Sequence, residues 1–182
     1  FFGNIGRLQG VENILTAIKL VKSKTAAFLF IGDGVKAKEV MNFCRTHPYS
    51  NAYYYGALSQ KERNEGLAAC DVALITLEKG MAGLGVPSKS YFTMAADRPI
   101  FAVMDSKAEI SRVIAEHKIG WTCEPSNPVK MASMIDMICE EFGQHQVNSS
   151  RQVFLDNYSA KISLEKLIEI FDLFELEKNA QN

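Results

Sequence analysis

The stretch GMAGLGVPSKSYFTMAADRPIFAV, residues 80–103, decides the fold that we expect for this chain. A glycine-rich loop leads through Pro87 into a helix whose first turn carries Ser88 and Lys89, and the apolar run that follows predicts a buried strand. Proline suits the start of a helix because its missing N–H would be unpaired there. The unpaired N–H groups at a helix N-terminus attract anions. The stretch therefore predicts a loop–helix unit that binds an anion.

The rest of the chain repeats this alternation of apolar runs and helical periodicity. Runs at residues 1–4, 26–32, 51–56, 71–77, 99–104 and 119–125 predict strands. Helices are predicted at about 10–22, 35–46, 60–69 and 128–142, with two more that end near 96 and 116. This alternation predicts βαβ units, and continuously apolar runs predict strands covered on both faces. The expected fold class is α/β: a Rossmann-like, doubly wound parallel sheet of about six strands with helices on both faces.

The tail, residues 148–177, has a purely helical pattern, with a second candidate helix start at SLEK, residues 163–166. We expect residues 1–182 to form one domain that includes tail helices at about 148–178. Because the first residues already have the pattern of a buried strand, we also expect the domain to belong to a longer chain. The apolar stripe of the tail consists of Tyr158, Ile162, Leu164, Leu167, Ile168, Phe171 and Phe174.

The composition narrows the class of function. The 182 residues include 47% hydrophobic and 23% charged positions, and the formal net charge of -1 gives no basic field that would favour nucleic acid. The four cysteines have no C-x-x-C spacing and the three histidines have no metal-ligand spacing, so we expect reduced thiols and no metal site. No apolar run is long enough to span a bilayer.

The two most glycine-rich segments are predicted to meet at one edge of the sheet. In an open α/β sheet, ligands bind beyond the carboxyl ends of the strands, where the strand order reverses. With the order 3-2-1-4-5-6, the loop after the first strand (residues 3–10) lies beside the loop after the fourth (residues 78–89). Arg7 from one loop and Lys89 from the other would each offer a cation, which suits a diphosphate.

Each of these signals also has a purely structural explanation. The glycines of both loops suit tight turns, and Arg7 and Lys89 suit a solvated surface. The first loop does not match the dinucleotide motif G-x-G-x-x-G, and neither loop is a Walker A sequence. The GDG sequence at residues 32–34 predicts a turn between strand and helix rather than a site.

Several segments resemble, in their order, the C-terminal half of GT-B glycosyltransferases of the group 1 (family 4) type. They are GNIGRLQGVENILTAIKLV, FLFIGDG, LAACDVALITL, GLGVPSKSYFTMAADRPIFAV and EISRVIAEHKIGWTCEP. The likeness covers nearly the whole chain and is strongest toward enzymes of surface-polysaccharide and O-antigen synthesis. It implies a C-terminal domain that binds the nucleotide-sugar donor, usually a UDP- or GDP-sugar. An N-terminal domain outside this sequence would bind the acceptor, a glycan or a lipid-linked sugar.

The resemblance also implies roles for individual residues. The first glycine loop, with Gly3, Gly6 and Arg7, contacts the diphosphate, while Ser88 and Lys89 lie near phosphate or ribose. Arg7 and Lys89 are the predicted catalytic residues, because they would stabilise the charge of the leaving group.

The resemblance places the two ends of the donor on other segments. The segment between Tyr55 and Leu58 would meet the base. The backbone amides that would approach the sugar belong to Ala82, Gly83, Leu84 and Gly85.

The sequence departs from the family pattern in three respects. Gln9 stands where many members have a lysine. The glutamate pair E-x7-E is missing from its expected positions, which hold Ala82 and a residue within 90–92, none of them acidic. The same spacing occurs by chance at Glu116/Glu124 and Glu169/Glu177, outside this loop. The second glutamate normally holds the ribose hydroxyls, so that contact is left unassigned. Asp97 replaces a glycine, and aspartate tolerates left-handed backbone better than most residues.

The implied reaction is transfer of a sugar, with retention, from a UDP-sugar to an acceptor hydroxyl in polysaccharide or glycan biosynthesis. Fixed cations and amides would stabilise the leaving group without a metal, so we expect no cofactor. The alternative is a non-catalytic nucleotide or sugar-phosphate-binding module, which the missing glutamates favour. We expect a cytoplasmic protein, peripherally associated with the inner face of the membrane where its acceptor is lipid-linked.

Overall fold

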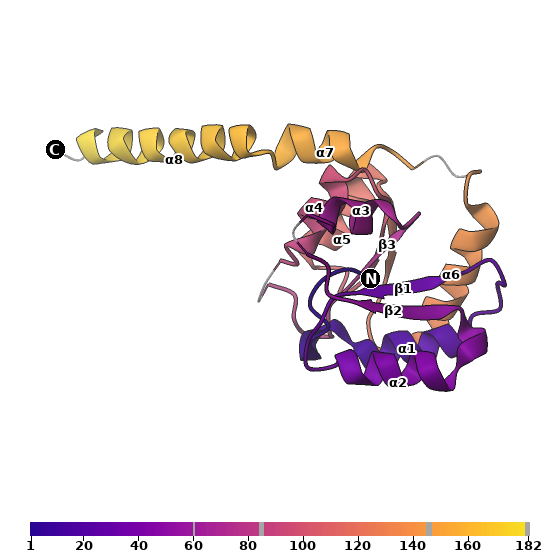
Figure 1. The fold of residues 1–182 in the computed structure, drawn as a ribbon. Helices are drawn as coiled ribbons and strands as arrows, with labels where there is room; N and C mark the ends of the chain where they lie inside the picture. Colours follow the sequence, from indigo (N-terminus) through magenta and orange to yellow (C-terminus); the bar gives the residue numbers. More distant parts are fainter. Residues whose placement is uncertain (60, 84–85, 145–146, 181–182) are drawn as a thin grey trace.

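A computed structural model describes residues 1–59, 61–83, 86–144 and 147–180. It contains two parallel sheets that together form the centre of an α/β fold (Figure 1). In the first sheet, β1 (Phe28–Ile31) pairs with β2 (Ala52–Gly56). In the second, the order is β3-β4-β5, with β3 (Ala73–Thr76), β4 (Ile100–Val103) and β5 (Gly120–Cys123). The α/β class and the parallel pairing predicted from the sequence are confirmed.

The number of strands is smaller than the predicted six, because the first apolar run does not form a strand. Phe2 makes only an isolated parallel bridge with Ile31, supported by the bond from the Ile31 N–H to the Phe1 carbonyl at 2.9 Å. Residues of this run share a small cavity with β3, and no strand pairing joins the two among the described residues. The run thus lies between the two sheets, in the place of the first strand in the order 3-2-1-4-5-6.

Helices cover both faces of the sheets, as predicted for a doubly wound fold. One face carries α1 (Val11–Leu20), α2 (Ala37–Thr46) and α6 (Pro128–Glu141), and the other carries α4 (Lys89–Ala95) and α5 (Glu109–His117), with α3 (Arg63–Ala68) nearby. Most of these bounds lie within about three residues of the expected ones.

Strand β4 explains why the sequence runs are apolar rather than alternating. All four of its residues are buried. Phe101 and Val103 join the core formed with α1, α2 and α6, whereas Ile100 and Ala102 join the core formed with α4 and α5. Successive side chains of a strand point to opposite faces, so a strand with helices on both sides needs apolar residues at every position.

The tail forms two helices, α7 (Ser150–Asn157) and α8 (Ala160–Ala180), where the second begins before the expected SLEK start. Asp97 has a left-handed backbone with φ of 55°, which confirms the expected role of this aspartate in a turn. Its carboxylate accepts hydrogen bonds from the Ser149 hydroxyl and the Arg151 N–H, at 2.8 Å and 3.0 Å, and so fixes the start of α7.

Helix α8 extends away from the body of the molecule (Figure 1), and much of the predicted apolar stripe is exposed. The exposed members include Leu164, Leu167, Ile168 and Phe171. Within the described part of the chain, no helix has the length and apolar character needed to cross a membrane.

Candidate functional site

The two glycine-rich loops meet in the structure. The Glu78 N–H, just after β3, donates to the Leu8 carbonyl at 2.8 Å, and the Thr76 hydroxyl donates to the Gln9 carbonyl at 2.5 Å. Thr76 is buried, so its hydroxyl needs a partner within the protein, and the Gln9 carbonyl provides it. The predicted convergence of the loop at 3–10 with the loop that follows β3 is therefore confirmed.

The first loop is held in place by the turn after β1. Gly3 donates to the Ile31 carbonyl at 2.8 Å and Ile5 donates to the Asp33 carbonyl at 2.8 Å. A Cβ on Gly32 would lie 1.8 Å from the Gly3 carbonyl oxygen, and one on Gly34 would lie 2.5 Å from the Ile5 oxygen. Glycines are required here because two backbones approach closely. The GDG sequence forms the expected turn, and it also supports the loop opposite.

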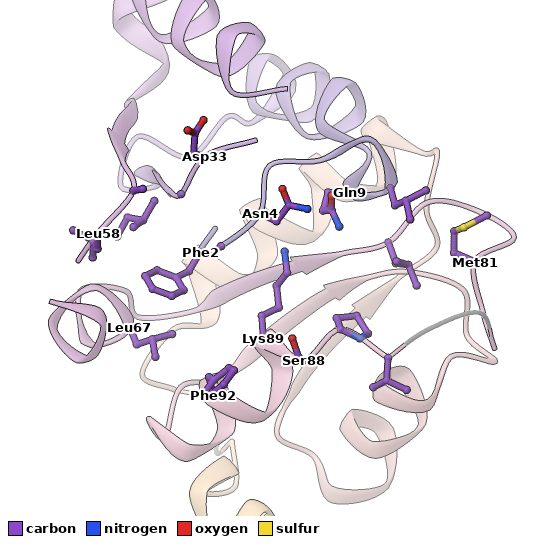
Figure 2. Close-up of a pocket in the computed structure, with 18 of the residues that line it drawn as sticks. Phe2, Asn4, Gln9, Asp33, Leu58, Leu67, Met81, Ser88, Lys89 and Phe92 are labelled. Carbon is purple, nitrogen blue, oxygen red and sulfur yellow. The ribbon is translucent and has the colours of Figure 1, made fainter. Parts of the chain in front are cut away.

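A pocket of about 810 Å³ opens where the loops meet, a size typical of small-molecule sites (Figure 2). The described residues that line it come from four segments. The first loop and the turn after β1 contribute Phe2, Gly3, Asn4, Leu8, Gln9, Ile31, Gly32 and Asp33. The region from β2 to α3 contributes Ala57, Leu58, Asn64 and Leu67, and the second loop with α4 contributes Leu77, Met81, Val86, Pro87, Ser88, Lys89 and Phe92.

Lys89 is the sole cationic side chain among the described lining residues. Its amine is buried and has no hydrogen-bond partner among the described residues, and it lies 4.1 Å from the centre of the Phe1 ring. Loss of hydration on burial lowers the pKa of Lys89 from 10.5 to about 8. A buried ammonium without a hydrogen-bonded anion is costly, so the site is prepared to accept a negative group.

Two side-chain amides face the same point. Figure 2 shows the Lys89 amine directed toward Asn4 and Gln9 on the first loop. The Gln9 Oε1 atom accepts from the Gly6 N–H at 2.9 Å, which leaves the NH2 group of Gln9 free to donate. The centre of the pocket thus offers mainly donors, which suits phosphate oxygens. The Gly6 N–H, predicted to contact a diphosphate, already has a partner in Gln9.

The structure does not bring all predicted site residues into the pocket. Gly3, Leu58, Ser88 and Lys89 line it. Arg7 is exposed on the 3-10 helix η1 (Arg7–Gln9) and does not line it.

The other predicted contacts also lie outside the lining. Tyr55 on β2 is 66% exposed and is not among the lining residues. Ala82 and Gly83 are not among them either, and Leu84 and Gly85 lie outside the described residues. Backbone contacts from these segments stay predictions.

Sequence reasoning missed Asn4, Asp33 and Phe92 as pocket residues. The resemblance expects an acidic residue within the range 90–92, and the three residues there lie in three different environments. Ser90 is completely buried, and the Tyr91 hydroxyl donates to the Glu109 carboxylate at 3.3 Å. Burial, with the charge of Glu109, raises the pKa of Tyr91 to about 12. Phe92 alone of the three lines the pocket, on the same side of α4 as Lys89 three residues before it.

Comparison with known proteins finds relatives over most of this chain. The family described as "Glycosyl transferases group 1" matches residues 1–141. "Probable glycosyltransferase WbjE" of Pseudomonas aeruginosa is 57% identical over 166 residues, which cover 91% of this chain and 42% of that protein.

Solved structures share the fold at low identity. The C-terminal domain of the group 1 glycosyl transferase LpcC from Francisella tularensis is similar with a TM-score of 0.68 and 14% identity, over 87% of this chain and 86% of that one. Anabaena Alr3699/HepE in complex with UDP is similar with a TM-score of 0.72 and 16% identity, over 94% of this chain and 48% of that one. The chain therefore spans about half of WbjE and HepE or less.

Proposed function

The chain belongs to the group 1 glycosyltransferases, and from this membership we propose that it is the part of such an enzyme that holds a nucleoside diphosphate sugar. The observation that carries the proposal is Lys89, a buried cation without a hydrogen-bonded partner that faces the donor groups of Asn4 and Gln9. A diphosphate would supply the anionic partner that the Lys89 ammonium lacks. UDP is the proposed nucleotide, because the Anabaena relative was solved with UDP.

The proposed reaction transfers the sugar to an acceptor hydroxyl. The bond between the anomeric carbon and the β-phosphate oxygen breaks, a bond to the acceptor oxygen forms, and the hydroxyl proton is released. Negative charge grows on the departing diphosphate during this step. A fixed ammonium stabilises that charge more in the transition state than in the donor, which lowers the barrier.

We propose that the acceptor, a glycan or a lipid-linked sugar, is bound by another part of the whole protein. A lipid-linked acceptor would bring the protein to the inner face of the membrane. The second candidate is a non-catalytic nucleotide-binding module. It is favoured by Phe92, which lines the pocket at the end of the range where an acidic residue is expected. Sugar transfer by the whole protein would exclude that second candidate.

Titration calorimetry of the chain with UDP, GDP and pyrophosphate tests the binding proposal. We expect UDP to bind, and Lys89→Met to weaken UDP and pyrophosphate by about tenfold to hundredfold, the worth of a hydrogen bond to a charged group. Methionine keeps the length of the buried stem and removes the charge. Lys79→Met is the matched control, since Lys79 is exposed in the same loop and does not line the pocket. Equal affinity of the Lys89→Met variant and the wild type would contradict the proposal.

A further inference from the structure

We propose that Phe92 packs against the nucleoside of the donor. Because α4 has no carboxylate beside Phe92 to hold the ribose hydroxyls, we expect the pocket to bind ribose and 2′-deoxyribose nucleotides with similar affinity. This inference rests on the proposed function, because it assigns the ends of a nucleoside diphosphate to the ends of the pocket.

The pocket has a polar centre and two apolar ends. Lys89, Asn4 and Gln9 form the centre. Figure 2 shows Phe92 and Leu67 toward one end and Met81 at the opposite one. A nucleoside diphosphate sugar has the same order, with a charged diphosphate between a base with its ribose and a sugar.

The end at Phe92 suits the base. Phe92 is 61% exposed, although it lines a pocket whose neighbouring wall carries Leu58 and Leu67. A phenyl ring exposed to water makes no favourable polar contact there. When it stacks on a planar base, it buries apolar surface and gains stacking energy. The two aromatic rings among the described lining residues, Phe2 and Phe92, lie away from the opposite end at Met81, so that end is left for the sugar.

Recognition of ribose hydroxyls needs acceptors, and carboxylates are the strongest of these. No carboxylate on α4 faces the pocket, because the helix has no acidic residue and presents Ser88, Lys89 and Phe92. Asp33 is the one carboxylate among the described lining residues. It accepts from the Gly34 N–H at 2.7 Å, and Figure 2 shows it directed away from Lys89 and Phe92. The other polar side chains on the walls around Phe92, Asn64 on α3 and Ser88 before α4, are neutral. A neutral acceptor left unpaired by a missing hydroxyl costs less than an unpaired carboxylate, so discrimination between the two sugars should be small.

The test compares UDP, 2′-deoxy-UDP and pyrophosphate by titration calorimetry on the wild type, Phe92→Ala, Phe92→Glu and a control, Phe142→Ala. Phe142 is a similarly exposed phenylalanine that does not line the pocket. We expect the wild type to bind both nucleotides within about threefold of each other. Phe92→Ala should weaken both by about tenfold, the worth of one stacked base, and leave pyrophosphate unchanged.

The remaining variants sharpen the result. Phe92→Glu should prefer UDP over 2′-deoxy-UDP, because it introduces an acceptor, while Phe142→Ala should equal the wild type. A wild type that prefers UDP by more than tenfold, or a Phe92→Ala variant that binds UDP as tightly as the wild type, overturns this inference while nucleotide binding itself stands. Absence of binding by both UDP and pyrophosphate overturns the proposed function and this inference together. Thermal unfolding of each variant checks that the substitution has not altered the fold.

Discussion

The two loops that form the pocket differ in what they fix and what they present. The first loop, residues 3–10, is tied by backbone hydrogen bonds to the turn after β1, yet its cation, Arg7, is exposed. The second loop leads into α4 and delivers Lys89, whose amine is buried at the centre of the pocket. One loop therefore supplies a wall that is held by backbone hydrogen bonds and carries amide donors, and the other supplies the charge.

Sequence patterns report the position of such loops but not the direction of their side chains. Glycine spacing reports where backbones approach closely, because only glycine fits, and it located both loops correctly. It does not report which side chain of a loop turns inward, since this depends on packing from distant segments. The sequence predicts a contact with phosphate for both Arg7 and Lys89, and only the fold shows that Lys89 lines the pocket and Arg7 does not.

The largest expected effect comes from disrupting the contact between the turn after β1 and the first loop. Gly32→Ala places a Cβ 1.8 Å from the Gly3 carbonyl oxygen at a φ of 141°, so either the turn or the first loop must move. We expect the free energy of unfolding to fall by about 3 kcal/mol or more, which chemical denaturation measures.

Gly80→Ala in the second loop is the matched control for that change. Gly80 also has a positive φ, of 83°, but a Cβ there meets nothing within 4 Å. The cost should be about 1 to 2 kcal/mol, from the backbone conformation alone. Equal losses in the two variants would show that the first loop is no more tightly constrained than the second.

The next effect concerns the charge on Lys89. A bound phosphate favours the ammonium form and raises the pKa of Lys89 above its value of about 8 in the free protein. Affinity for UDP should therefore be constant below about pH 8 and fall by up to about tenfold per pH unit above it. Calorimetry across pH 6.5 to 9.5 measures this, and Lys89→Arg, which stays charged, should remove the decline.

The same shift has an opposite consequence for the free protein. The folded pKa lies below the unfolded value of 10.5, so the unfolded chain binds more protons between about pH 8 and 10.5. The contribution of Lys89 to the free energy of unfolding thus increases as the pH rises through that window. For UDP binding, the outcome that would contradict the role of the Lys89 amine is a pH profile of affinity that is identical in the wild type and in Lys89→Arg.

The smallest effect is expected at Arg7. Its side chain is exposed and does not line the pocket, so its influence on a bound diphosphate acts through solvent and is screened by salt. Arg7→Ala should weaken UDP by less than about threefold at 0.15 M salt. A loss as large as that of Lys89→Met would mean that Arg7 swings into the pocket when the nucleotide binds, and the contrast between the loops would fail.

Most of the architecture follows from the sequence. Periodicity gave the helices within a few residues, and the continuous apolar runs predicted strands with both faces buried, as at β4. The prediction of a strand at residues 1–4 is wrong, because Phe2 makes only an isolated bridge. Asp97 was understood correctly as a left-handed turn, but its second role as the anchor of α7 depends on Ser149 and Arg151, far along the chain.

The site was less predictable than the fold. Ser88 and Lys89 came from the sequence, because a proline followed by these residues marks a helix start. Asp33 and Phe92 did not, since their presence in the pocket depends on how α4 and the turn after β1 face each other. An aromatic residue three positions after Lys89 was the available signal, because positions three apart share a helix face.

We propose that both loops hold one nucleoside diphosphate. Hydrogen–deuterium exchange of the chain with and without saturating UDP tests it most directly, since it reports on each segment separately. We predict slower exchange in peptides that cover residues 3–10 and in those that cover residues 86–95, with no change in α6. Protection confined to one of the two segments, or to neither while UDP is bound, would contradict it.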